Sequence, residues 1–166
     1  FNKLKISSFN KLSNNVPKVE GRGIEKKIKI GNKTVRFFDE SYNASPKSMD
    51  VCIKYFNYLK INSSQKKFLI LGDMNELGKE SKKYHINIIK KINDNNFDHT
   101  ILCGEIFKKA LKDVQSIKKT VIHILNEKKI INFLKKNIHN NDVLLIKGSN
   151  STKVNNLAKM INYKEE

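Results

Sequence analysis

The chain has 166 residues, which suits one domain with a buried core. No apolar run is long enough to cross a bilayer, so we exclude a membrane-spanning protein. Cys52 and Cys103 stand apart, with no CxxC pair and no nearby histidine, which argues against a disulfide scaffold and a zinc site and favours the reducing cytoplasm. The chain begins with Phe1 and no signal pattern follows, so we expect a fragment of a longer protein or a processed chain.

The formal net charge is +17, a value that ordinarily indicates binding to nucleic acid or to an anionic membrane. Here 31 of the 33 basic residues are Lys, and only Arg22 and Arg36 are Arg. Proteins that read nucleic acid favour Arg, whose planar side chain binds bases and phosphates through paired hydrogen bonds. Lys, Asn and Ile are all over-used, as drift in an AT-rich coding sequence would produce. We therefore interpret the charge as a solvated surface and expect no nucleic-acid partner.

Along the chain, residues 1–20 show weak periodicity and are interpreted as a tail or linker. A hairpin is expected next, because apolar residues flank the turn dipeptide Gly31-Asn32. Helices and strands alternate from there to the end. The expected helices lie near residues 46–60, 80–94, 105–113, 126–138 and 152–162, and the expected strands are 67–73, 99–104, 119–124 and 142–148.

The apolar faces of two helices follow from helical spacing. They are expected to consist of Met49, Ile53, Phe56 and Leu59 in the first helix, and of Tyr84, Ile88, Ile89 and Ile92 in the second. The run 67–73 is apolar without a break, which is typical of a strand buried on both faces.

This alternation predicts an α/β fold with a mostly parallel sheet, helices on both faces and an antiparallel hairpin at its start. In such Rossmann-like sheets, ligands bind beyond the carboxyl ends of the strands. We therefore expect the ligand-binding residues in the loops after residues 38, 71, 102, 123 and 147.

The segment FFDESYNASPKSM, residues 37–49, carries far more hydrogen-bonding groups than a connecting loop needs. Two acids, a phenol and an amide follow the strand (Asp39, Glu40, Tyr42, Asn43). Ser45-Pro46 then begins a helix, since Ser caps helices and Pro suits the first turn. The polar side chains are candidates to contact a ligand.

The segment LGDMNELGKES, residues 71–81, superficially resembles a phosphate-binding P-loop. We reject that function, because five residues separate Gly72 from Gly78 and Lys79 is followed by Glu80. A tight strand-to-helix turn capped by Ser81 explains the glycines but not the polar residues between them.

The segment DVLLIKGSNST, residues 142–152, ends a strand and precedes a helix. Free N–H groups at the helix start, together with Lys147, could form an anion site. A capped helix with Lys147 in solvent explains the spacing equally well. The four histidines show no ligand spacing, and most are expected at the surface or at strand ends. Arg22 lies between two glycines, either exposed at a hinge or able to reach a ligand.

Taken in order, the segments GRG, DESYNASPKSM, LGDMNELGKESKKYH, ILCGE and DVLLIKGS resemble the C-terminal domain of the Mur ligases over roughly residues 15–162. The blocks containing Tyr42 and Asp73 resemble the branch that adds D-alanyl-D-alanine to UDP-N-acetylmuramoyl-tripeptide. The resemblance implies that residues 1–20 are the end of an ATPase domain and a hinge, and that residues 21–166 form the C-terminal domain. It also implies a monomeric cytoplasmic enzyme of peptidoglycan synthesis.

In this family the substrate carboxylate and ATP form an acyl phosphate, which the incoming amine attacks. The resemblance implies that the missing central domain holds the P-loop and most Mg²⁺ ligands, so that no catalytic or metal-binding residue lies in this chain and the chain alone is inactive. The implied nucleotide-binding residues are Arg22, Asp39, Glu40, Tyr42 and Asn43. The implied substrate-binding residues are Lys147, Gly148 and Ser149.

Two positions depart from the family pattern. Ser45 stands where the family usually has Asn, and Asn150 stands where Arg is common, so a charge there is lost or has moved to Lys153. Two alternatives stay open: a related ligase of the Mur or folylpolyglutamate type with another amino-acid substrate, or a basic module that binds nucleic acid.

Overall fold

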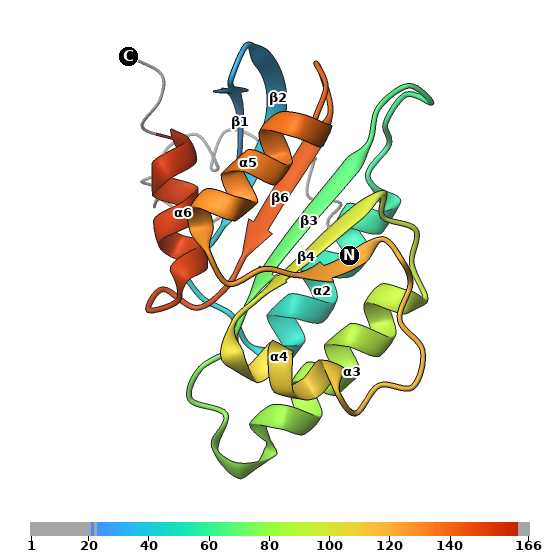
Figure 1. The fold of residues 1–166 in the computed structure, drawn as a ribbon, viewed down its shortest axis with the longest axis vertical. Helices are drawn as coiled ribbons and strands as arrows, with labels where there is room; N and C mark the ends of the chain where they lie inside the picture. The colour runs from blue at the N-terminus through green and yellow to red at the C-terminus, as the bar shows by residue number, and fades with distance from the viewer. Residues whose placement is uncertain (1–20, 22, 163–166) are drawn as a thin grey trace, which may run out of the picture.

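A computed structural model describes residue 21 and residues 23–162 (Figure 1). The predicted hinge over residues 1–20 and the predicted site residue Arg22 lie outside the described residues. The strands are β1 (Ile24–Ile30), β2 (Lys33–Glu40), β3 (Lys67–Gly72), β4 (His99–Cys103), β5 (Val121–His123) and β6 (Val143–Lys147). The helices are α2 (Pro46–Tyr58), η1 (Gly78–Glu80), α3 (Ser81–Asn93), α4 (Glu105–Leu111), α5 (Glu127–Asn137) and α6 (Lys153–Asn162).

The strands form one sheet in the order β1-β2-β6-β3-β4-β5. The β1–β2 pair is antiparallel, and the other four neighbouring pairs are parallel. Strands β2 and β6, far apart in sequence, lie side by side with Glu40 opposite Lys147 in the register. These observations confirm the predicted α/β class and the hairpin.

Two hydrophobic layers cover the sheet because successive strand residues point to opposite faces. On β3, Leu69 and Leu71 belong to the layer under α2, α3 and α4, whereas Phe68 and Ile70 belong to the layer under α5 and α6. Figure 1 shows these two sets of helices on either side of the sheet. A strand buried on both faces must be apolar throughout, which explains the unbroken apolar run.

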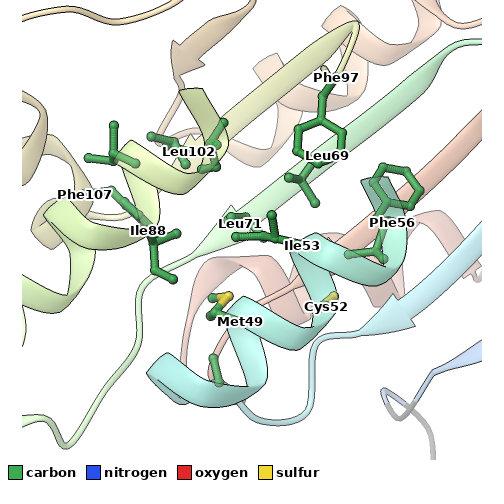
Figure 2. Packing of buried hydrophobic residues seen from close by; sticks show 14 of the residues in the cluster. Met49, Cys52, Ile53, Phe56, Leu69, Leu71, Ile88, Phe97, Leu102 and Phe107 are labelled. Atoms are coloured by element: carbon green, nitrogen blue, oxygen red, sulfur yellow. The ribbon is translucent and has the colours of Figure 1, made fainter. Parts of the chain in front are cut away.

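Helix α2 begins as its sequence predicts. Ser45 caps it, with the Ser45 hydroxyl accepting the Ser48 N–H and the Ser48 hydroxyl accepting the Ser45 N–H, and Pro46 occupies the first turn. The buried side of α2, with Met49, Ile53 and Phe56, packs on the strands (Figure 2). This packing fixes the loop between β2 and α2 at both of its ends.

Helix α3 corrects two predictions. Its buried face is formed by His85, Ile88, Ile89 and Ile92, while Tyr84 is 38% exposed. The spacing 85-88-89-92 centres the face on the histidine. Ser81 also fails to cap α3: it lies inside the helix, and its buried hydroxyl has no hydrogen-bond partner among the described residues.

The other helix ends differ from the predicted ends by at most two residues. Leu59, predicted inside the first helix, caps its carboxyl end and stays partly buried. In the described part of the chain, no helix is both long and apolar enough to span a bilayer.

Candidate functional site

Two segments that are separate in sequence meet at the carboxyl end of β2. The Gly23 N–H donates to the Asp39 carbonyl (2.8 Å), and the Tyr42 N–H donates to the Gly21 carbonyl (3.2 Å). A Cβ at Gly21 would lie 2.8 Å from the Tyr42 nitrogen, and its φ of +77° favours glycine. The structure therefore packs the glycines around Arg22 directly against the polar loop.

A pocket opens at this junction, which we call the Glu40 pocket. It has a volume of about 360 Å³ and is lined by Gly21, Glu40, Tyr42, Asn43, Ser45, Ser48 and Lys147. A second hollow of about 690 Å³ shares Glu40, Ser45, Ser48 and Lys147 with it and continues between α2 and β2. The Glu40 pocket is polar at its mouth, and the second hollow is lined largely by apolar side chains such as Phe38, Val51 and Tyr55.

The two neighbouring acids occupy different environments. Asp39 is 6% exposed, and its Oδ1 accepts the Ser41 N–H (3.0 Å) and the Ser41 hydroxyl (2.7 Å). Glu40 is half-buried and lines the pocket, with Oε2 3.6 Å from the Lys147 Nζ. The sequence left open which acid faces a ligand, and the geometry favours Glu40.

Lys147 is 3% exposed, so the interpretation that places it in solvent is wrong. Its Nζ donates to the Asn43 carbonyl at 2.8 Å and lies beside the Glu40 carboxylate. Strand alternation explains the direction, since Lys147 follows Leu145 on the face covered by α2. Lys147 therefore lies on the same side of the sheet as the polar loop after β2.

Ser149 and Gly148 lie on a different side. The Ser149 N–H donates to the Asp73 carbonyl (3.2 Å), and its hydroxyl accepts the Asn75 N–H (3.0 Å). A Cβ at Gly148 would lie 3.2 Å from the Gly72 Cα, so the two strand ends touch there. These residues join the loop after β6 to the loop after β3.

Asp73 has a structural role that the sequence did not predict. Its Oδ2 accepts the Ile106 N–H and its Oδ1 the Phe107 N–H, both at 3.0 Å, so it caps the start of α4 from another element. Gly104 has a φ of +140°, and a Cβ there would lie 2.2 Å from the Asp73 carboxyl carbon. In the sequence, the only hint of this contact is that Gly72-Asp73 ends one strand and Cys103-Gly104 ends the next.

His85 supports the same loop from below. Its Nε2 accepts the Met74 N–H (3.0 Å), which requires the Nδ1–H tautomer, and Nδ1 donates to the Ser81 carbonyl (2.7 Å). Burial holds the pKa of His85 below its ordinary value. The other histidines fit the expectation, because His99 begins β4, His123 ends β5 and His139 is exposed.

A smaller hollow of about 260 Å³ lies over the ends of β3, β4 and β6. Its lining includes Asp73, Asn75, Ser151, Thr152 and Lys153. Asn150, which departs from the family pattern, is exposed and does not line it.

The two cysteines are poor nucleophiles. Burial raises the pKa of Cys52 to about 12 and that of Cys103 to about 11, so both thiols are protonated at neutral pH. Within the described residues, no three His, Cys, Asp or Glu side chains lie close enough together to hold a metal ion.

The structure thus brings Glu40, Tyr42, Asn43 and Lys147 to one pocket. Asp39 does not line this pocket, and its carboxylate accepts hydrogen bonds from Ser41. The ligand-binding roles of these residues remain predictions.

Comparisons with known proteins agree with this architecture. Residues 27–150 match the family described as Mur ligase, glutamate ligase domain. Curated relatives named UDP-N-acetylmuramoyl-tripeptide--D-alanyl-D-alanine ligase include those of Bacillus subtilis (31% identity over 125 residues), Borreliella burgdorferi (30% over 124) and Rickettsia prowazekii (31% over 144). The matches cover 73%, 75% and 87% of this chain, and 26%, 26% and 30% of the relatives. The chain therefore spans between a quarter and a third of their length.

Solved structures show the same fold. A MurF ligase from Thermotoga maritima in complex with ADP superposes with a TM-score of 0.71 at 22% identity, over 95% of this chain and 36% of that one. A MurF structure from Acinetobacter baumannii gives a TM-score of 0.75 at 20% identity, over 96% and 34% of the two chains. With the family match over residues 27–150, the chain belongs to the Mur ligase family, as its glutamate ligase domain.

Proposed function

We propose that this chain is the C-terminal domain of an ATP-dependent ligase that adds D-alanyl-D-alanine to UDP-N-acetylmuramoyl-tripeptide in the bacterial cytoplasm. The domain covers the nucleotide and helps to hold the dipeptide, while the rest of the enzyme supplies the P-loop and most of the Mg²⁺ ligands. Closure of such a domain excludes water from the acyl phosphate, which would otherwise be hydrolysed.

The observation that carries the proposal is the Glu40 pocket. Residues from the ends of β2 and β6 and from the loop before α2 meet there, although more than 100 positions separate Asn43 from Lys147. Crevices beyond the carboxyl ends of strands are where open α/β sheets bind ligands. The curated relatives that carry the D-alanyl-D-alanine ligase name support the substrate assignment.

The pocket fits a nucleotide chemically. The Glu40 carboxylate can accept hydrogen bonds from two adjacent ribose hydroxyls, because it offers two oxygens and is half-exposed. Tyr42 and Asn43, both exposed, add further polar groups at the mouth. Arg22, which neighbours these residues in sequence through Gly21 and Gly23, would supply a cation for the phosphates.

We assign the dipeptide to the other loop pair, around Gly148 and Ser149. Ser149 contacts Asp73 and Asn75, which line the hollow over β3, β4 and β6 together with Lys153 at the start of α6. A carboxylate of the dipeptide would find a cation and N–H groups there.

The test is ATP-dependent phosphate release by the full-length protein with UDP-N-acetylmuramoyl-tripeptide. We expect release with D-alanyl-D-alanine and little with D-alanine, L-glutamate or other single amino acids. A preference for a single amino acid would instead support the alternative ligase with another substrate. Turnover by residues 1–166 alone would contradict the assignment of the phosphate-transfer groups to the rest of the enzyme.

Binding to nucleic acid is tested separately. A basic module would bind any DNA duplex tightly at low salt and release it steeply as salt rises. We expect negligible binding at physiological salt in a filter assay, since 31 of the 33 basic residues are Lys and only two are Arg, the residue that nucleic-acid readers favour.

A further inference from the structure

We propose that Lys147 is a positioning residue for the nucleotide and does not contact the dipeptide. Its buried ammonium holds the loop of residues 41–45 and the Glu40 carboxylate in the arrangement that binds ATP. This inference rests on the proposed function, and it reverses the substrate-side role that the sequence resemblance implies for Lys147.

The contacts of the ammonium carry the inference. The Lys147 Nζ donates to the Asn43 carbonyl at 2.8 Å and lies 3.6 Å from the Glu40 Oε2, with the side chain 3% exposed. Lys147 reaches the loop from β6, whereas Glu40 and Asn43 belong to the end of β2 and the loop after it. The lysine therefore ties the end of β6 to the loop that follows the neighbouring strand β2.

Burial makes this tie specific. An ammonium removed from water needs nearby acceptors to offset its lost hydration, and here those acceptors are the Asn43 carbonyl and the Glu40 carboxylate. The loop conformation that supplies the carbonyl is thus favoured over others. The same loop presents Tyr42 and Asn43 at the mouth of the Glu40 pocket.

The two residues after Lys147 contact the other neighbour of β6, the end of β3 and its loop. Gly148 and Ser149, which follow Lys147, turn to Gly72, Asp73 and Asn75 on the far side of β6. Lys147 does not line the hollow over β3, β4 and β6, where the dipeptide is assigned. Lys147 and its two successors therefore serve different sides of the site.

The chain offers a matched control in Lys67. It is also buried, 7% exposed, on the neighbouring parallel strand, and its Nζ donates to the Asn57 carbonyl at 2.6 Å. It begins β3, so it lies at the amino end of the strands, away from the Glu40 pocket. Lys67→Met removes a buried lysine of the same kind without touching the pocket.

The experiment compares Lys147→Met and Lys67→Met in the full-length enzyme. We expect K147M to raise the KM for ATP and the Kd for ADP about ten-fold, as for loss of a hydrogen bond from a charged group, and to change the KM for D-alanyl-D-alanine less than about two-fold. K67M should leave all three constants within about two-fold, whatever it costs in thermal stability. A purely structural role of Lys147 would not produce this split.

Three results would overturn the proposal: an unchanged ATP constant in K147M, a rise confined to the dipeptide, or an equal rise in both. If K147M does not fold, Lys147→Gln replaces it, since its amide can still donate one hydrogen bond; the same split is expected at smaller size, and its absence counts against the proposal. The Kd for ADP needs no acceptor substrate. A wild-type enzyme that binds ADP but rejects D-alanyl-D-alanine would therefore contradict the proposed function and leave the test of Lys147 readable.

Discussion

The loops after β2 and β3 look equally functional in the sequence, yet they use their polar groups differently. After β3, the Asp73 carboxylate is engaged by two amides of α4, and Asn75 is engaged by Ser149 and Ser151. After β2, Glu40, Tyr42 and Asn43 line a pocket and are at least partly exposed. The two loops therefore differ in what their carboxylates do: Asp73 caps α4, whereas Glu40 lines a pocket beside Lys147.

The strongest test of this comparison is Asp73→Ala. We expect the free energy of unfolding to fall by about 3 kcal/mol, because two helix N–H groups lose a charged acceptor in a buried place. Urea unfolding measures this change. Asp113→Ala is the control, since that acid pairs with Lys82 at the surface and should cost about 0.5 kcal/mol or less. Equal losses in the two variants would remove the structural role assigned to Asp73.

Glu40→Gln tests the other loop. We expect the KM for ATP to rise about ten-fold, while the unfolding free energy changes by only about 1 kcal/mol, because the side chain is partly exposed. Arg22→Ala and Asp39→Ala should raise the same KM. Steady-state kinetics of the full-length enzyme provide the measurement, with Glu25→Gln, in an exposed pair with Arg36, as control. Unaltered ATP kinetics in all three site variants would show that the nucleotide lies elsewhere.

His85 links the loop after β3 to pH. Because burial lowers the pKa of His85 in the folded state, the unfolded chain binds the proton more readily. The contribution of neutral His85 to the free energy of unfolding is therefore fully present above the ordinary pKa of about 6.5. The free energy of unfolding falls as the pH drops toward the folded-state pKa, by about 1 kcal/mol between pH 7.5 and 5.5. Urea unfolding at both pH values should show a smaller difference in His85→Gln. His99, whose pKa burial also lowers, should keep part of the dependence. An undiminished difference in His85→Gln would contradict the buried neutral imidazole.

Ser81→Ala should give the smallest change and in the opposite direction. The Ser81 hydroxyl is buried without a partner among the described residues, so removing it should stabilise the protein by about 0.5 kcal/mol. Thermal unfolding would detect it. A loss of stability would mean that Ser81 holds the turn after all.

The sequence alone determined the α/β alternation, the hairpin and the start of α2. These features depend on local rules: unbroken apolar runs for strands buried on both faces, Gly31-Asn32 for a turn, and Ser45-Pro46 for a cap. It also pointed to FFDESYNASPKSM as a place for chemistry, through an excess of polar groups.

Only the tertiary structure decided how those groups are used. The strand order places β2 beside β6, so the Lys147 side chain contacts the Asn43 carbonyl. Ser149, two residues later, contacts the loop after β3 instead. In the tertiary structure Asp73 also caps α4, the helix after β4, and His85 is buried in the core where Tyr84 was expected. Such assignments depend on contacts between residues far apart in the chain, and the pattern of neighbouring residues carries no information about which distant group fills a hydrogen bond.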